Sequence, residues 1–444
     1  MLSFCPARLR GVFRRPFGSR GPQIAAAAIA ACAGIAAPMV AVAPAQADIV
    51  RQQQQWVLDA LDVPSAWHIT RGDGVLVAVI DSGVDPTVSD LNGSVTTGPD
   101  LTGVHTPSAD PNWGSHGTWM ASLIAGHGHG VDAGDGIIGI APQARILSIR
   151  VITDRTDPGY ATYQDEPPGR GQRELATAIR YAVDHHAKVI SMSLGYNVPS
   201  ITVRAALQYA MTHNVVVVAS SGNAGSAQIS RGHGHAPYSF PADYPGVIGV
   251  AAVGRSGLPA YFSSDNLSVE VAAPGVSVPA EGRGDHYWVV SGTSPACALT
   301  AGVAALIKSR YPRLTAPQIR RAIIWSASKR PPGGYDDELG FGTVDADSAL
   351  RFAGRLAHEH AGRRRTARRI VAAGFYGGGP GGVAPVPVAP RGVRALLAWC
   401  GLAIAFLLLA LAALWRLATG LTASRRPRHA APSQPDYWHP GARL

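Results

Sequence analysis

The chain has 444 residues and a formal net charge of +10, from 39 Lys and Arg against 29 Asp and Glu. The positive charge lies at the ends, because residues 48–354 hold 21 basic and 27 acidic side chains and carry a net charge of −6. A central block of negative sign is a poor phosphate-binding surface and argues against a nucleic-acid-binding protein, and a hydrophobic content of 46% excludes disorder throughout.

Residues 1–47 are predicted to be a secretory signal peptide. Five Arg residues precede an uncharged, Ala-rich stretch from Ile24 to Val42, and Ala45-Gln46-Ala47 has the small-x-small pattern of a cleavage site. The alternative is an uncleaved signal anchor, but a stretch made mostly of Ala and interrupted by Pro38 is only weakly hydrophobic. We expect cleavage after Ala47 and export of a mature chain that starts with an N-terminal extension, residues 48–74.

Short apolar runs alternate with helical patterns through residues 75–352. Continuous Val- and Ile-rich runs are typical of parallel strands that are buried on both faces. The alternation predicts a doubly wound α/β domain, with a mostly parallel sheet, helices on both faces and a site beyond the carboxyl ends of the strands. The predicted strands are Val75–Ile80, Ala144–Val151, Lys188–Ser193, Val215–Ala219, Val247–Val253 and Val269–Ala272. The predicted helices are Thr118–Ala125, Glu174–His186, Thr202–His213, Ser294–Lys308 and Ala316–Ser326.

The C-terminal part is predicted to tether this domain to a membrane. Residues 353–394 form an Arg-containing and then Gly/Pro-rich linker, and residues 395–415 contain no charged side chain. A helix over that stretch would cross the ~30 Å hydrocarbon core of a bilayer. The excess of Arg after the span places the tail, residues 416–444, in the cytoplasm. Both ends of the chain therefore indicate a single-pass protein of the cell membrane whose domain lies on the extracytoplasmic side. A buried core helix is the alternative for residues 395–415, but this stretch is apolar all round.

Four polar residues in loops or at helix starts stand out. Asp81 directly follows the first predicted strand, His116 lies in Gly-Ser-His-Gly-Thr, and Asn223 follows the fourth predicted strand in Ser-Gly-Asn-Ala-Gly. Ser294 lies in Ser-Gly-Thr-Ser-Pro-Ala at the start of the longest predicted helix of the domain. Each motif alone is common in loops, and Ser294 alone would be an ordinary helix cap. The four motifs together, in this chain order, are a far more specific signal than any one of them.

The order Asp, His, Asn, Ser resembles the subtilisin-like serine proteases. The resemblance covers most of residues 55–350 and includes three further motifs: Gly139-Ile140-Ala141-Pro142, Ile190-Ser191-Met192-Ser193-Leu194-Gly195 and Gly340-Phe341-Gly342-Thr343-Val344-Asp345. It implies a subtilisin-like fold and hydrolysis of protein or peptide substrates through an acyl-enzyme, with no cofactor.

The chemistry of that reaction explains these residue types. Ser294 would be the nucleophile, and His116 would remove its proton because imidazole titrates near neutral pH. Asp81 would bond the other ring nitrogen of His116 and orient it, and Asn223 would donate a hydrogen bond to the oxyanion. The family pattern assigns Ser193, Leu194 and Gly195 to pairing with an extended substrate; a plain strand end is the alternative.

The two ends of the chain narrow the resemblance to the mycosins, the membrane-bound subtilases of type VII secretion systems. The segments Gln53–Leu58 and Asp81–Asp85 are similar to the N-terminal part of that group. The resemblance implies processing of proteins exported by such a system and association with its membrane complex. The alternative function is that of a structural subunit in which proteolysis is secondary.

Three features depart from the family pattern. Residues 48–74 are too short for a folding-assistant propeptide, so we expect them to pack on the domain, and whether they restrain the cleft stays open. Pro295 follows the nucleophile, at a position in the first helical turn that tolerates proline. Cys297 is the only Cys of residues 48–394, so the disulfides common in mycosins cannot form, and its apolar surroundings indicate a buried hydrophobe.

Metal binding has only weak support in the sequence. Two Gly-His tracts contain four histidines, which could be either exposed loop side chains or metal ligands. They are His127, His129, His233 and His235. Family members often bind structural calcium, but no acidic loop here is distinctive enough to name ligands. We therefore predict no metal site.

Overall fold

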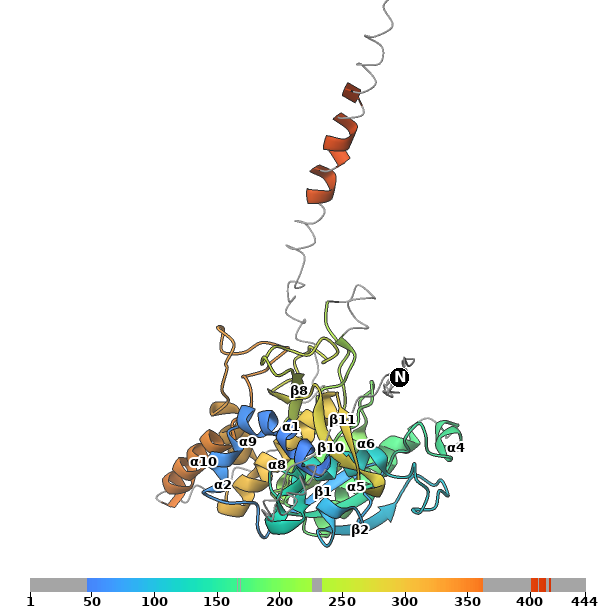
Figure 1. Cartoon of the computed structure of the whole chain (residues 1–444), viewed down its shortest axis with the longest axis vertical. Coiled ribbons are helices and arrows are strands. Elements are labelled where there is room, and N and C mark those ends of the chain that lie inside the picture. The colour runs from blue at the N-terminus through green and yellow to red at the C-terminus, as the bar shows by residue number, and fades with distance from the viewer. Residues whose placement is uncertain are drawn as a thin grey trace, which may run out of the picture. The chain divides into compact units, whose positions relative to one another are not determined.

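The computed structural model describes residues 46–165, 167, 169–225, 234–361, 401–405, 407–412 and 415–416 (Figure 1). The chain divides into two units, Met1–Gly379 and Pro380–Leu444, which are described separately. Most of the predicted signal peptide and the predicted tail after residue 416 lie outside the described residues.

The first unit is built on one seven-stranded sheet in the order β2-β5-β1-β6-β7-β8-β9, in which every neighbouring pair is parallel. Six of these strands confirm predicted ones within a few residues: β1 Leu76–Asp81, β5 Arg145–Arg150, β6 Val189–Met192, β7 Val216–Ser220, β8 Ile248–Val253 and β9 Val271–Pro274. The predicted α/β class with a parallel central sheet is therefore confirmed.

Both faces of the sheet are buried, which explains the continuous apolar runs. Along β1, Val77 and Val79 belong to the hydrophobic core on one face, whereas Ala78 and Ile80 belong to the core on the other. Because side chains alternate along a strand, a strand covered on both faces needs apolar residues at every position.

Helices cover both faces, as predicted. One core includes side chains of α3 (Ser115–Ala125), α8 (Thr293–Arg310), α9 (Ala316–Trp325) and α10 (Ala346–Ala361). The core of the opposite face is closed by α5 (Arg170–Asp184) and α6 (Ile201–Thr212). Helix α8 contacts five of the sheet strands, and almost its whole length is buried.

Several short elements, each of three to six residues, were not predicted. Strand β2 (Val95–Asp100) lies at the sheet edge, contains Gly98-Pro99 and pairs only with β5, across an irregularity in register. The others are the hairpin β3 (His127–His129) and β4 (Asp135–Ile138), the hairpin β10 (Val278–Gly282) and β11 (His286–Val290), helix α4 (Tyr160–Gln164), and the 3-10 turns η1 (Ser89–Leu91), η2 (Val131–Ala133) and η3 (Arg283–Asp285).

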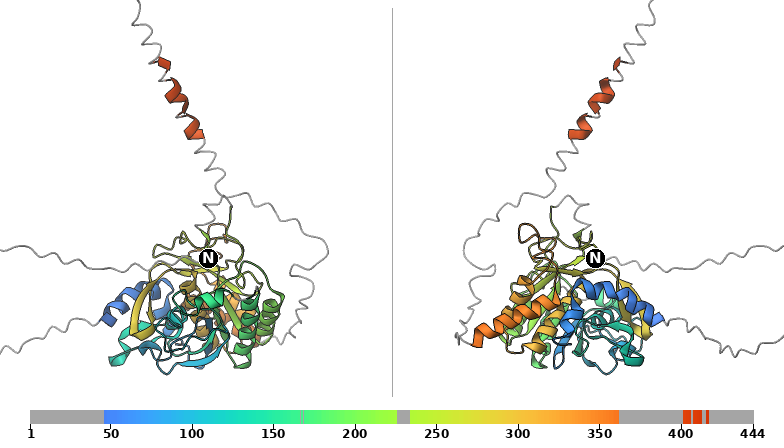
Figure 2. Two further views of the ribbon diagram at one scale, coloured as in Figure 1. Left: turned by 90° about the vertical axis from the view of Figure 1, so that its right-hand side faces the viewer. Right: turned by 60° about the vertical axis from the view of Figure 1, so that its left-hand side comes forward.

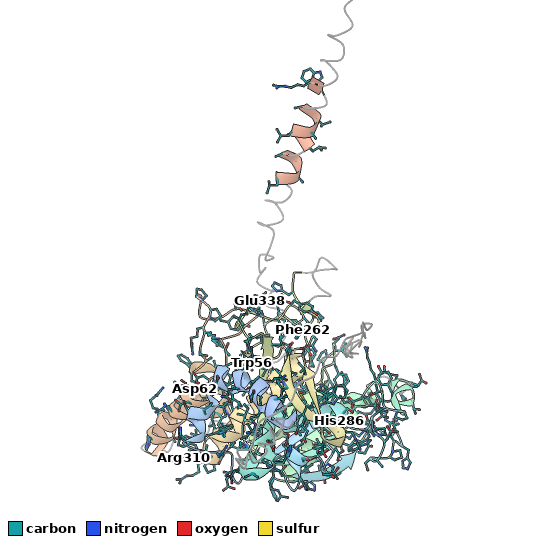
Figure 3. The ribbon with its side chains drawn as sticks, in the orientation of Figure 1. Trp56, Asp62, Phe262, His286, Arg310 and Glu338 are labelled. Atoms are coloured by element: carbon teal, nitrogen blue, oxygen red, sulfur yellow. The ribbon has the colours of Figure 1, made fainter. Side chains whose placement is uncertain are left out.

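The N-terminal extension packs on the body as helices α1 (Gln46–Ala60) and α2 (Val63–Trp67). Figure 2 shows α1 in blue beside the yellow segment that includes β10, and the two elements are in contact. The Gln54 side chain donates to the main-chain carbonyl of Ile138 at 2.8 Å and accepts from its N–H at 3.1 Å, so it extends the edge of β4. Trp56, labelled in Figure 3, has the guanidinium of Arg255 5.3 Å from its ring centroid.

The predicted boundary between domain and linker at residue 352 is too early. Helix α10 continues to Ala361, and Ala353 and Leu356 are buried in the core. The stripe of buried residues at 346, 349, 350, 353 and 356 has helical spacing, so packing on α8 and α9 extends the domain beyond the predicted end. Residues 362–394 of the predicted linker lie outside the described part of the chain.

The second unit is described only at residues 401–405, 407–412 and 415–416, which are helical. The predicted membrane span, 395–415, includes these residues together with others that lie outside the description. No helix among the described residues is both long enough and apolar enough to cross a membrane.

Candidate active site

Asp81 is the last residue of the central strand β1 and is buried. Its Oδ1 accepts from the main-chain N–H of Ser82 at 2.7 Å and lies 2.8 Å from Nδ1 of His116. Gly83 follows with φ of +102°, and a Cβ there would lie 2.7 Å from the ring of Trp113. The turn after β1 therefore needs glycine, and it fixes the Asp81 carboxylate at the carboxyl end of the sheet.

His116 is the second residue of α3, and 18% of its side chain is exposed. The helix starts after Gly114, which has φ of +68°. A Cβ at Gly117 would lie 2.1 Å from the carbonyl oxygen of Gly83, so only glycine lets α3 approach the turn after β1 so closely. This approach sets the short distance between His116 and Asp81.

The surroundings of His116 change its basicity. Burial alone lowers the pKa of the imidazole, but the charge and hydrogen bond of Asp81, together with the charge of Asp154, outweigh burial and raise the pKa to about 9. An imidazole of raised pKa is a stronger base once it has lost its proton. The pairing of Nδ1 with Asp81 leaves Nε2 as the ring atom that can exchange a proton with another group.

Ser294 is the second residue of α8 and is buried, with 6% exposed. Its hydroxyl donates to the main-chain carbonyl of Ser193 at 3.4 Å, and the Ser193 hydroxyl donates to the carbonyl of Ser294 at 3.1 Å. Pro295 lies in the first turn of α8, where its missing N–H has no partner within the helix. Helix α8 packs against α3, which carries His116.

Asn223 lies three residues beyond β7 and contacts the residue before Ser294. Its Oδ1 accepts from the main-chain N–H of Thr293 at 2.8 Å and from the Thr293 hydroxyl at 3.0 Å. These two bonds turn the acceptor end of the amide toward α8 and the Nδ2 donor end away from Thr293. The arrangement can present an N–H group beside the N-terminus of α8, where the helix dipole also favours negative charge.

The predicted substrate-pairing residues follow β6, and the first of them, Ser193, contacts Ser294. Ser193 and Leu194 are buried, whereas Gly195 is exposed. A Cβ at Gly195 would lie 2.2 Å from the hydroxyl of Ser239, so a larger residue here would require the Ser239 side chain to move. The next residue, Tyr196, forms an antiparallel bridge with Phe240.

The predicted site residues thus lie at the carboxyl ends of β1, β6 and β7 or on the two helices beside them, as expected for a parallel sheet. The structure brings Asp81 to His116, Asn223 to the N-terminus of α8, and Ser193 to Ser294. Such a set can deprotonate a hydroxyl, orient the base and stabilise a developing oxyanion.

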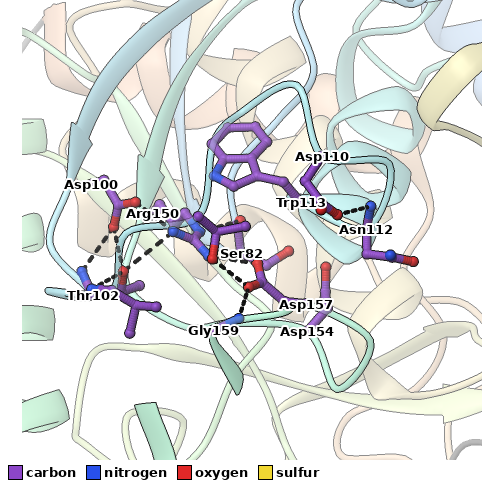
Figure 4. A network of polar contacts seen from close by, with 12 residues as sticks. Ser82, Asp100, Thr102, Asp110, Asn112, Trp113, Arg150, Asp154, Asp157 and Gly159 are labelled. Atoms are coloured by element: carbon purple, nitrogen blue, oxygen red, sulfur yellow. Dashed lines mark hydrogen bonds and ion pairs between the residues drawn. The ribbon is translucent and has the colours of Figure 1, made fainter. Parts of the chain in front are cut away.

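Several residues that shape this site were not predicted. Arg150, in β5 beside β1, is 2% exposed and donates from Nε to the main-chain carbonyl of Ser82 at 3.1 Å (Figure 4). Its Nη2 donates to the buried Asp157 at 2.7 Å. Asp154 lies between them in sequence and accepts from the main-chain N–H of His116 at 3.2 Å. A charged residue inside an apolar strand was the one available signal for Arg150.

The histidine tracts have other contacts in the structure. His129 pairs with Asp90 at 2.6 Å and His235 with Asp337 at 2.9 Å, while both ring nitrogens of His127 bond main-chain carbonyls. His233 lies outside the described residues. Within the part of the chain that the structure describes, no group of three His, Cys, Asp or Glu side chains is arranged to hold a metal ion.

Cys297 lies one turn after Ser294 in α8 and is fully buried. Burial raises the pKa of its thiol to about 12, which disfavours the nucleophilic thiolate. The prediction of a buried hydrophobe at this position is confirmed.

Comparison with known proteins is consistent across sequence and structure. The chain matches the model of the Subtilase family over residues 72–342. It is 35% identical over 321 residues to fervidolysin of Fervidobacterium pennivorans, covering 67% of this chain and 43% of that protein. It is 36% identical over 299 residues to thermitase of Thermoactinomyces vulgaris, covering 67% of this chain and 96% of thermitase. The chain therefore spans less than half of fervidolysin and nearly all of thermitase.

A similar solved structure is that of MycP1, described as a serine protease and an essential component of the type VII (ESX-1) secretion system. The two chains are 34% identical, with a TM-score of 0.53 over 66% of this chain and 88% of MycP1.

Proposed function

The chain belongs to the subtilase family, and on that premise we propose that it is a serine endopeptidase whose nucleophile is Ser294. The observation that carries the proposal is the 2.8 Å contact between Nδ1 of His116 and Oδ1 of Asp81. This contact fixes the tautomer in which Nε2 of the neutral ring is a proton acceptor.

The reaction follows from these roles. Neutral His116 takes the hydroxyl proton of Ser294 as the oxygen attacks the scissile carbonyl, and Asp81 stabilises the resulting imidazolium. The imidazolium then gives its proton to the leaving amine, which leaves an acyl-enzyme on Ser294. Water, deprotonated by His116, hydrolyses the acyl-enzyme and restores the hydroxyl.

The oxyanion is stabilised by groups on two elements. Asn223 donates from Nδ2, because its Oδ1 is already engaged by Thr293. The N-terminus of α8 adds the main-chain N–H of Ser294 and the helix dipole. The peptide substrate lies along Ser193, Leu194 and Gly195 as an added strand.

We further propose that the enzyme acts at the outer side of the cell membrane and processes proteins of a type VII secretion system. Support for the secretion role comes from the similarity to MycP1. Support for export and tethering comes from the sequence alone, from the signal-like residues 1–47 and the uncharged stretch 395–415. A fusion of alkaline phosphatase to the C-terminus tests this topology: a cytoplasmic tail gives no activity, and an active fusion contradicts it.

Proteolysis is tested with the purified full chain in detergent and its Ser294→Ala variant. The wild type should digest an unfolded protein such as reduced casein. The kcat/KM of the variant should be lower by a factor of at least about 10³. Equal digestion by both would show that the activity does not come from Ser294. Cells that carry Ser294→Ala in place of the wild type separate the enzyme from a structural subunit, since normal secretion in those cells would favour the structural role.

A further inference from the structure

We propose that Asp154 is a second carboxylate of the active site: a positioning residue that holds the first turn of the His116 helix and stabilises the protonated imidazole. The inference rests on the proposed function and adds a residue that supports the catalytic base, His116. It is carried by the contacts at the start of α3. Figure 4 labels two of the residues involved, Asp154 and Ser82, near Arg150 and Asp157.

Helix α3 has no capping side chain of its own, because its N-cap is Gly114. The first main-chain N–H groups of a helix have no partner within it, and buried ones need an acceptor from elsewhere. Here Asp154 Oδ2 accepts from the N–H of His116 at 3.2 Å, and the Ser82 hydroxyl accepts from the N–H of Gly117 at 3.1 Å. Two consecutive donors of the helix are therefore held by the turns after two neighbouring strands.

Those two strands are β1 and β5, which pair in parallel with Asp81 opposite Arg150. The turn after β1 supplies Asp81 to the imidazole and Ser82 to the helix. The turn after β5 supplies Asp154 to the same helix. His116 is thus fixed from both turns, through its ring by one carboxylate and through its main chain by the other.

The turn that carries Asp154 is itself anchored. The main-chain N–H of Asp157 donates to the carbonyl of Asp154 at 3.0 Å and closes the turn. The Asp157 side chain is fully buried and accepts from Arg150 at 2.7 Å, from the Thr106 hydroxyl at 2.7 Å and from the N–H of Gly159 at 2.8 Å. A turn pinned by a buried ion pair is a rigid support for the Asp154 carboxylate.

The electrostatic consequence follows from which groups face His116. Among the described residues, the charged groups that raise its pKa are Asp81 from β1 and Asp154 from the turn after β5. Burial raises the pKa of Asp154 as well, and the charge of His116 opposes that shift. The two groups therefore favour each other's charged form, and Asp154 makes His116 harder to deprotonate.

The test replaces Asp154 by Asn, which keeps an acceptor oxygen for the helix and removes the charge. The ionisation of His116 is read from the rate at which diethyl pyrocarbonate modifies it at each pH, with the modified peptide quantified by mass spectrometry. Only the neutral ring reacts, so the midpoint of that rate reports the pKa without any turnover. In the full chain, Asp154→Asn should lower this midpoint by about one pH unit, the size of effect expected from one nearby opposite charge.

The matched control is Asp165→Asn, which removes an exposed carboxylate eleven residues further along the same segment. It should leave the midpoint unchanged. Asp154→Ala should lower the midpoint equally and also lower Tm, because the cap of α3 is lost. An unchanged midpoint in Asp154→Asn, or an equal shift in Asp165→Asn, would overturn the proposal.

Failure of the proposed function would be visible separately. If wild type and Ser294→Ala digest casein equally but Asp154→Asn still moves the midpoint, the carboxylate acts on His116 in a protein that is not a Ser294 protease. If the wild type digests casein and the midpoint does not move, the function holds and Asp154 has no part in it.

Discussion

Thr293 donates both its main-chain N–H and its hydroxyl to Oδ1 of Asn223, at 2.8 and 3.0 Å. The two residues are 70 positions apart, and they join the turn after β7 to the N-terminus of α8. Because one oxygen receives both bonds, the amide orientation is set by the protein, and the Nδ2 donor is held in place before any substrate arrives. Such a preorganised donor costs no reorganisation during the reaction.

Asn223→Asp separates the donor role of this side chain from its structural role. The carboxylate keeps an acceptor for Thr293 but has no N–H to give. We expect kcat to fall by about 10²–10³ with little change in KM, the range found when subtilisin loses one such donor. Initial rates on a peptide substrate measure this, and an unchanged Tm would show that the contact with Thr293 persists. A variant with wild-type kcat would remove Asn223 from the oxyanion site.

The pH dependence of kcat/KM should show the raised pKa of His116. The base must be neutral to accept the proton of Ser294, so activity rises as His116 loses its own proton. Since the pKa is raised from 6.5 to about 9, the acid limb of the profile should lie clearly above neutral pH. Rates of fluorophosphonate inactivation between pH 5 and 10 should follow the same limb. A midpoint at or below 6.5 in both profiles would contradict the electrostatic account.

Arg150 and Asp157 should stabilise the fold as a pair. Arg150→Met leaves Asp157 buried without its partner, so the free energy of unfolding should fall by about 3–5 kcal/mol. The double variant Arg150→Met/Asp157→Asn should recover part of that loss, because the buried carboxylate is gone and the other partner of Arg150, Asp100, is exposed to solvent. Denaturant unfolding measures both. Arg145→Met, at an exposed position of the same strand, is the control and should change stability little. Equal stability of Arg150→Met and wild type would exclude this role of the pair.

The N-terminal extension should behave as part of the domain. Leu61 is fully buried in the core, and its carbonyl accepts from the N–H of Ala346 at the start of α10. Leu61→Ala should therefore lower the free energy of unfolding by about 2–5 kcal/mol. Gln53→Ala, on the exposed side of α1, should have little effect. A Leu61→Ala variant of unchanged Tm but higher activity would indicate that the extension restrains the cleft rather than supports the core.

The parallel sheet could be predicted because its strands are buried on both faces and read as continuous apolar runs. Strand β2 could not, since an edge strand with Gly98-Pro99 lacks that pattern. Helix α10 was not predicted, even though its buried residues have helical spacing. The nearby Arg run and Gly/Pro-rich segment suggested that a linker begins at residue 353. In the structure, packing on α8 and α9 instead keeps this segment helical to Ala361.

The proposed catalytic residues could be selected from their order and from their places after strands and at helix starts. Their supports were not, because those contacts depend on turn conformations that a linear pattern does not encode. Asp154 is the fourth residue after β5, in a segment without a recognisable motif, and it reaches His116 only because β5 and β1 are neighbours. The role of Thr293 likewise depends on the approach of β7 and α8.

A nucleophilic Ser294 activated by His116 can be detected chemically. The full chain is treated with a fluorophosphonate probe, and the adduct is located by peptide mass spectrometry. We expect one adduct on the peptide that contains Ser294, at least about 10³-fold slower labelling in His116→Gln, and no adduct in Ser294→Ala. An adduct on another residue, or labelling of the wild type and His116→Gln at the same rate, would contradict it.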